Sequence, residues 1–170
     1  MSGEKREQGQ REPKSKLRDA RILVAEDNVE IKELMAVILS SEGAHFEFAE
    51  TGPEALQKAL SQPFDVILMD LTLPELTGEE VVKKIRQEGL QTPIIAFSAY
   101  SEDQRKSNCL AIGFNDYITK PFDIDTLSKK VERYLKRKTN PTKHWVDSRT
   151  RGRTSEKNKR PQFQPPTRHN

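Results

Sequence analysis

The sequence predicts an α/β fold in which five short strands alternate with five helices. Two observations support this prediction. Most of the apolar runs are continuous over four or five residues, which is typical of strands covered on both faces. The segments between them place apolar residues at helical spacing, and the two patterns alternate strictly along the chain. Such alternation favours a parallel sheet with helices on both faces.

The predicted strands differ in how they alternate apolar and polar residues. In one of them, Phe46 and Phe48 alternate with His45 and Glu47, so this strand is expected at an edge of the sheet. The five predicted strands are 22–25, 44–49, 66–69, 93–97 and 116–119.

The predicted helices carry recognisable start signals. Thr51 with Glu54, and Thr77 with Glu80, form the spacing of a capping box, in which hydroxyl and carboxylate satisfy free N–H groups. Asp123 is the expected cap of the last helix. Glycines expected to stop helices in a left-handed conformation follow three of them: Gly43, Gly89 and Gly113.

Five strand–helix units most often form a doubly wound sheet with strand order 2-1-3-4-5, the flavodoxin-like arrangement. A barrel of eight units needs about 250 residues, and this chain has 170. We therefore predict a flavodoxin-like (βα)5 sheet over residues 19–138.

The charged residues are distributed unevenly and predict tails on both sides of this domain. Residues 19–135 hold 12 Lys/Arg and 21 Asp/Glu, whereas residues 136–170 hold 11 Lys/Arg and two acids. Residues 1–18 and 139–170 lack apolar periodicity, so we predict a disordered N-terminal tail and a disordered, basic C-terminal tail.

Neither a secretion signal nor a disulfide is expected. The first residues form no apolar run, and no segment approaches the ~18 apolar residues that a membrane span needs. Cys109 is the single cysteine, so no intrachain disulfide can form. We expect a cytoplasmic protein without membrane contact.

Polar side chains follow four of the predicted strands. Glu26 and Asp27 follow the first, Asp70 the third, Ser98 the fourth and Lys120 the fifth. Ligands of open α/β sheets bind at the carboxyl ends of the strands, so these side chains are expected at one edge. Clustered carboxylates repel one another unless a cation holds them, and their hard oxygens suit Mg²⁺. A carboxylate there can act as nucleophile and form an aspartyl phosphate.

Four segments in order resemble the receiver domains of two-component response regulators: ILVAEDN (22–28), VILMDLTLPELTG (66–78), IIAFSA (94–99) and DYITKPF (116–122). The resemblance implies that Asp70 is the phosphoacceptor. It implies that Asp27 binds Mg²⁺ directly, Glu26 mainly through water, and Thr72 through its main-chain carbonyl.

The resemblance also implies roles for residues near the end of the sheet. Lys120 would pair with Asp70 and then with the phosphoryl group, and Ser98 would donate a hydrogen bond to a phosphoryl oxygen. Tyr117 would be the switching aromatic, and the bond before Pro121 would be cis. The family's usual signalling surface is the face formed by the fourth helix, fifth strand and fifth helix.

The expected function is that of a single-domain response regulator. A histidine kinase or histidine phosphotransfer protein would supply the phosphoryl group, and an unidentified protein would read the signal. Such a chain catalyses only its own Mg²⁺-dependent phosphorylation and dephosphorylation.

Two other functions compete with this interpretation. A haloacid-dehalogenase-like phosphatase also uses a strand-end aspartate with Mg²⁺, but it needs a second acid where Thr72 stands. A basic tail over 139–170 could instead contact nucleic acid or an acidic partner weakly.

Each site residue also has an ordinary structural explanation. Glu26 and Asp27 could cap a helix, for example. Their joint arrival at one edge favours the site.

Overall fold

The computed structural model describes residues 15–99 and 102–138. Five strands and five helices alternate along this part of the chain, as the sequence predicts. In chain order they are β1 (Arg21–Ala25), α1 (Val29–Ser41), β2 (His45–Ala49), α2 (Gly52–Ser61), β3 (Val66–Asp70), α3 (Gly78–Gln87), β4 (Ile94–Ser98), α4 (Glu102–Ile112), β5 (Asp116–Thr119) and α5 (Ile124–Lys138).

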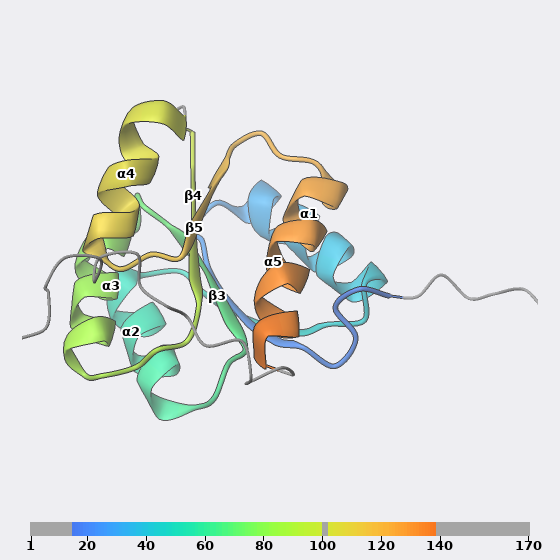
Figure 1. Ribbon diagram of the computed structural model, residues 1–170, viewed down its shortest axis with the longest axis horizontal. Coiled ribbons are helices and arrows are strands. Elements are labelled where there is room, and N and C mark those ends of the chain that lie inside the picture. Colours follow the sequence, from blue (N-terminus) through green and yellow to red (C-terminus); the bar gives the residue numbers. More distant parts are fainter. Residues whose placement is uncertain (1–14, 100–101, 139–170) are drawn as a thin grey trace, which may run out of the picture. The chain divides into compact units, whose positions relative to one another are not determined.

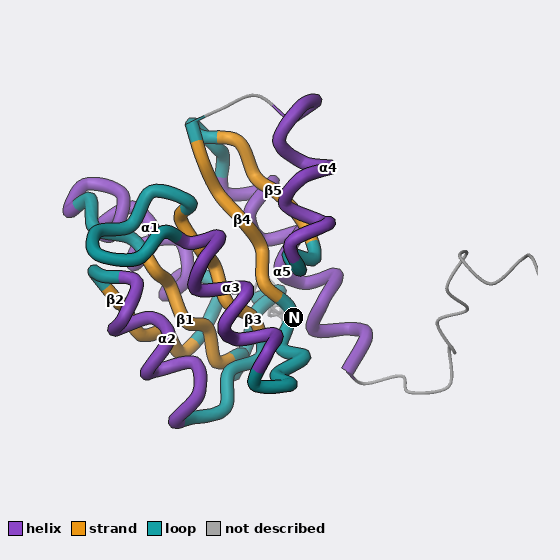
Figure 2. The backbone as a smooth tube through the Cα atoms, turned by 90° about the vertical axis from the view of Figure 1, so that its left-hand side faces the viewer, coloured by secondary structure: helices purple, strands orange, loops and turns teal. Residues whose placement is uncertain are grey.

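The strands form one parallel sheet in the order β2-β1-β3-β4-β5, which confirms the predicted flavodoxin-like topology (Figure 2). Every residue of β3 and β4 is buried. The strand β2 lies at an edge, and its first residue, His45, is exposed. The alternating pattern therefore indicated the edge position of β2 correctly. It did not indicate the edge position of β5, the strand at the other end of the sheet, which is mostly buried.

Helices cover both faces of the sheet. Figure 1 shows α2, α3 and α4 on one side of the strands and α1 and α5 on the other. Side chains of each strand alternate between these two layers, so there are two apolar cores. Leu23, Ile67 and Tyr117 belong to the core under α2, α3 and α4. Ile22, Leu68 and Ile118 belong to the core under α1 and α5.

The predicted helix caps are present, with one difference. Thr77 and Glu80 form a complete capping box at the start of α3. Asp123 accepts the Thr126 N–H at 2.6 Å at the start of α5. The Thr51 hydroxyl accepts the Glu54 N–H, but the Glu54 carboxylate accepts the N–H of Glu50 instead of that of Thr51. The α2 box is therefore displaced by one residue on its carboxylate side.

A glycine brings α3 close to the end of β3. A Cβ atom added at Gly78 would lie 2.0 Å from the carbonyl oxygen of Asp70. Only a residue without a side chain allows this approach. The amino end of α3 is thereby fixed against the strand that carries Asp70.

The N-terminal boundary of the folded part differs from the expected one. Leu17 is fully buried in the core under α1 and α5, and the Lys16 N–H donates to the Glu42 carboxylate at 2.8 Å. Residues 15–18, which the sequence places in the tail, therefore pack on the domain. One leucine in a polar segment shows no periodicity, so pattern reasoning missed it. The other predicted tail residues, 1–14 and 139–170, lie outside the described residues.

Within residues 15–99 and 102–138, no helix combines the length and apolar character needed to cross a bilayer.

Candidate functional site

Three carboxylates meet at the carboxyl edge of the sheet. Glu26 and Asp27 directly follow β1, and Asp70 ends β3, the neighbouring strand. One oxygen from each lies within 4.8 Å of the others. Glu26 and Asp70 are buried, whereas Asp27 is exposed. The cluster therefore combines an enclosed side with a side open to solvent, and its oxygen donors are of the kind that Mg²⁺ prefers.

Lys120 neutralises part of this negative charge. Its Nζ forms ion pairs with Asp70 Oδ2 and with Glu26 Oε2, the latter at 2.6 Å. The same atom lies 4.7 Å from the centre of the Phe97 ring, a favourable position for a cation over an aromatic face. The peptide bond that follows, to Pro121, is cis, as the resemblance implies.

The Asp70 carboxylate is held from both sides. Its Oδ1 accepts the Thr72 N–H at 2.8 Å and the Thr72 hydroxyl at 2.9 Å. Its Oδ2 pairs with Lys120. These contacts fix the orientation of the carboxylate, and a fixed nucleophile loses little freedom on reaction.

Burial raises the pKa of the Glu26 carboxyl above its usual value. The hydrogen bond from Lys120 and the N–H of Asn28, 3.0 Å from Glu26 Oε1, oppose this rise, and the nearby Asp70 charge adds to it. Among the described residues, three carboxylates share one ammonium group, so negative charge exceeds positive charge in this pocket.

Ser98 and Tyr117 lie on β4 and β5 next to this cluster. Ser98 ends β4 and is buried, one residue beyond the Cα partner of Asp70. Tyr117 is fully buried in the core under α2, α3 and α4. The structure thus brings Ser98 to the edge where Asp70 and Lys120 lie. The switching role of Tyr117 stays a prediction.

Sequence reasoning missed several residues that shape the site. Asn28 caps α1 through its side chain, which accepts the Ile31 N–H, and its own N–H holds Glu26. A polar residue just before an apolar helical stripe was the available signal. Phe97 and Gly78 gave no local signal, because their contacts with Lys120 and Asp70 come from other segments.

An apolar groove of about 340 Å³ lies beside the site. It is lined by Ile31, Leu34, Ala99, Lys120, Pro121 and Phe122. Its lining combines α1 with the segment that follows β5, so a molecule seated in the groove would lie next to Lys120.

Comparison with known proteins gives sequence relatives over most of the folded part. DltR of Streptococcus agalactiae, a transcriptional regulatory protein, is 39% identical over 111 residues, which cover 65% of this chain and 50% of DltR. The response regulator ArlR of Staphylococcus aureus is 37% identical over 81% of this chain and 60% of ArlR. The chain therefore spans 50% and 60% of the length of these curated relatives.

Solved structures of similar chains share the fold. A Francisella response regulator receiver domain is 33% identical, with a TM-score of 0.68 over 71% of this chain and 99% of that one. The receiver domain of the sensor histidine kinase PA1611 of Pseudomonas aeruginosa is 34% identical, with a TM-score of 0.64 over 69% of this chain and 98% of that one. The latter structure has a magnesium ion coordinated in its active-site cleft.

The family description "Response regulator receiver domain" matches residues 22–132. This range includes the carboxylate cluster, Lys120 and all five strands except Arg21, the first residue of β1. The chain therefore belongs to the receiver-domain family of two-component response regulators.

Proposed function

We propose that this chain accepts a phosphoryl group on Asp70 from a histidine kinase or histidine phosphotransfer protein. The observation that carries the proposal is the Asp70 carboxylate itself. It is buried among carboxylates, yet fixed by Lys120 on one oxygen and by Thr72 on the other. A carboxylate that served only to stabilise the fold would not need two further acids beside it.

The transfer exchanges one bond for another. An Asp70 oxygen forms a bond to phosphorus as the bond from phosphorus to the donor's imidazole nitrogen breaks, and that nitrogen keeps the electron pair. Lys120 already lies against Asp70 and offsets charge on the phosphoryl oxygens. Ser98, buried at the same edge, donates its hydroxyl to one of these oxygens.

The donor set fits a divalent cation. In the proposal Mg²⁺ is held by Asp27 and Asp70, by Glu26 mainly through water, and by the main-chain carbonyl of Thr72. When bound, the ion offsets negative charge on the carboxylates and on the phosphoryl oxygens. The exposed position of Asp27 and the magnesium ion in the PA1611 receiver domain support this assignment.

The phosphoryl donor is a protein in this proposal, and the groove beside Lys120 supports it. Leu34 of the groove lining is an exposed apolar side chain, and α1 carries two further exposed apolar side chains, Val29 and Val37. Kinases of this class take their phosphoryl group from ATP, so the proposed location is the cytoplasm.

The output in this proposal is protein contact by a stand-alone receiver. Phosphorylation of Asp70 would move Ser98, and the ring of Tyr117 would follow. The face of α4, β5 and α5 would then present a changed surface to a downstream protein. The position of Tyr117, two residues from the Cα partner of Ser98, supports such coupling.

The test is incubation of the full chain with acetyl phosphate or phosphoramidate, with and without Mg²⁺. We expect one hydroxylamine-sensitive phosphoryl adduct, detected by intact mass and located on Asp70 by peptide mapping. Asp70→Asn should form none, and the matched variant Asp125→Asn, which changes an exposed acid of α5, should react as the unchanged chain does. A folded chain that forms no adduct would contradict the proposal.

Two alternatives give different results. Steady turnover of a phosphate ester would favour a phosphatase, although Thr72 stands where that mechanism needs an acid. Nucleic-acid binding by the basic tail concerns residues 139–170, which lie outside the described residues. Deleting 139–170 and measuring DNA and RNA binding at two salt concentrations tests that prediction.

A further inference from the structure

One buried hydroxyl at the edge of the site has no hydrogen-bond partner within the described part of the chain. It belongs to Thr119, the last residue of β5. A second hydroxyl of this kind, Ser128, lies in α5. Nearly all buried hydroxyls in native proteins are paired, so an unpaired one indicates an unusual requirement at its position. Thr119 differs from Ser128 because it lies directly before Lys120.

The strand register places Thr119 beside Ser98. The two residues are Cα partners in neighbouring strands. Side chains alternate along a strand, and Ile118 belongs to the core under α1 and α5, so Thr119 lies on the other face. Phe97 also belongs to the core under α1 and α5, which places Ser98 on the same face as Thr119. Neighbouring strands are about 4.8 Å apart, so two hydroxyl groups can bridge them.

We propose that Thr119 is a positioning residue for Ser98. Its hydroxyl donates a hydrogen bond to Ser98 Oγ when the hydroxyl of Ser98 donates to a phosphoryl oxygen on Asp70. A hydroxyl has one donor and two acceptor lone pairs, so Ser98 can make both bonds at once. A hydrogen bond donated to Ser98 Oγ polarises the O–H group of Ser98 and strengthens the hydrogen bond from this group to the phosphoryl oxygen. The inference rests on the proposed function, because it needs a phosphoryl group on Asp70.

The backbone next to the two hydroxyls is already fixed. The Lys120 N–H donates to the Ser98 carbonyl at 2.8 Å, which holds the ends of β4 and β5 together. Only a side-chain rotation is then needed to form the bond. Since Thr119 Oγ1 has no partner among residues 15–99 and 102–138, pairing it favours the phosphorylated state.

The experiment uses beryllofluoride with Mg²⁺ as a mimic of the phosphoryl group on the full chain. Its affinity is measured by fluorine NMR titration, and stability without the mimic is measured by urea denaturation. We expect Thr119→Val to weaken beryllofluoride binding about three- to tenfold, the change given by one ordinary hydrogen bond. Its stability without beryllofluoride should equal or exceed that of the unchanged chain, because an unpaired hydroxyl has been removed.

Two variants separate this role from packing. Thr119→Ser keeps the hydroxyl and should restore the affinity, and Ser128→Ala removes the other unpaired hydroxyl and should leave the affinity unchanged. If Thr119→Val folds poorly, Thr119→Ala against Thr119→Ser gives the same comparison. Unchanged affinity in the variant without the hydroxyl, or equal loss in Thr119→Ser, would overturn the inference. A folded, unchanged chain that binds no beryllofluoride would overturn the proposed function itself.

Discussion

Two buried aspartates in this sheet have opposite surroundings. Asp70 lies at the carboxyl end of β3 with two further carboxylates and Lys120. Asp116 lies at the amino end of β5, where Lys130 and Arg133 of α5 approach it to 3.2 and 3.4 Å. Asp70 has more acids than cations around it, whereas Asp116 has more cations than acids. Burial is the same, so charge balance distinguishes them.

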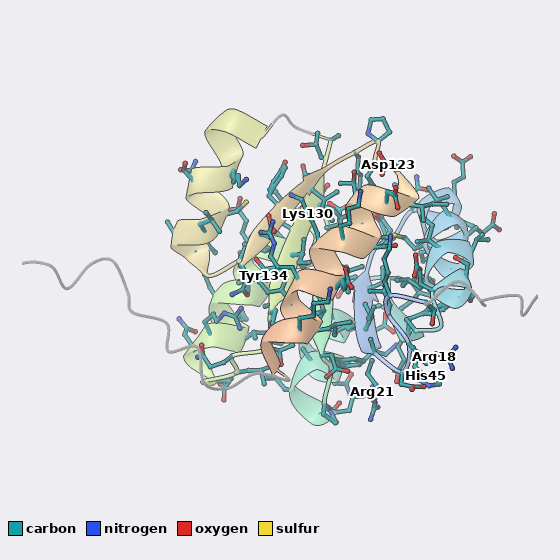
Figure 3. The ribbon with its side chains drawn as sticks, turned by 45° about the vertical axis from the view of Figure 1, so that its right-hand side comes forward. Arg18, Arg21, His45, Asp123, Lys130 and Tyr134 are labelled. Atoms are coloured by element: carbon teal, nitrogen blue, oxygen red, sulfur yellow. The ribbon has the colours of Figure 1, made fainter. Side chains whose placement is uncertain are left out.

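The difference indicates which aspartate is available for chemistry. Asp116 also accepts the N–H of Tyr117 at 2.8 Å. Lys130 and Tyr134, which Figure 3 labels on α5, donate to its carboxylate at 3.2 and 3.5 Å. Its charge is compensated within the fold. The cluster at Asp70 needs more positive charge than Lys120 supplies, so it favours a cation and a group that the cation attracts. The predictions below test this contrast.

The largest expected difference concerns phosphoryl capture. Asp70→Asn should abolish reaction with acetyl phosphate, because an amide is not a nucleophile for phosphorus. Asp116→Asn should react at the rate of the unchanged chain as long as it is folded, since Asp116 lies at the opposite end of the strands. Intact mass against time measures both. Slow reaction of folded Asp116→Asn would remove the contrast.

The same two substitutions should affect the free energy of unfolding in the opposite order. Asp116→Asn should lower the free energy of unfolding by about 1–3 kcal/mol, because Lys130 and the Tyr117 N–H lose a charged acceptor. Asp70→Asn should lower it less or raise it, since one of three clustered carboxylates is neutralised while Lys120 keeps Glu26. Urea denaturation without divalent ions measures both. A larger loss in Asp70→Asn would contradict this interpretation.

Magnesium should stabilise the chain through the Asp70 cluster alone. At ten times its dissociation constant, Mg²⁺ should raise the free energy of unfolding by about 1.4 kcal/mol. Asp27→Asn should lose most of this gain, because it removes the exposed ligand, and Asp116→Asn should keep it. Denaturation of the unchanged chain and both variants, each with and without MgCl₂, gives the three gains. Equal gains in Asp27→Asn and the unchanged chain would exclude Asp27 as a ligand.

The smallest expected effect concerns the start of α3, the helix that follows Asp70 in the chain. Thr77→Ala should lower the free energy of unfolding by about 1 kcal/mol, since it removes the cap of α3. The Thr77 hydroxyl holds the pKa of Glu80 below its usual value. In the unchanged chain, this stabilisation is fully present above the pKa that Glu80 has in the unfolded state. It is lost as the pH falls through the lower pKa that Glu80 has in the folded state.

Thr77→Ala should consequently show a shallower loss of stability on acidification. Ser40→Ala, which changes an exposed serine of α1, is the control and should follow the unchanged chain. Denaturation at several pH values between neutrality and the acid range measures the slopes. Parallel slopes for Thr77→Ala and the unchanged chain would show that the capping box does not set the pKa of Glu80.

The sequence alone predicted the strand–helix alternation, the strand order and the meeting of acids with Lys120. The alternation was predictable because apolar runs and helical spacing are local patterns. The strand order followed from the commonest arrangement of five strand–helix units, and in such a sheet the residues after the strand ends lie at one edge. The α2 cap was predicted in part, because Thr51 binds as expected while the carboxylate of Glu54 takes the N–H of a different residue.

Tertiary structure decided what local patterns do not encode. Lys120 reaches Glu26 across 94 positions of sequence, and its place over the Phe97 ring depends on how β4 lies against the segment after β5. The burial of Leu17 and the unpaired hydroxyl of Thr119 depend on packing by distant segments. The sequence by itself determined which groups gather at the carboxyl edge, because strand ends fix it. Their charge balance and hydrogen bonding were decided only by the fold, because those depend on distances between remote residues.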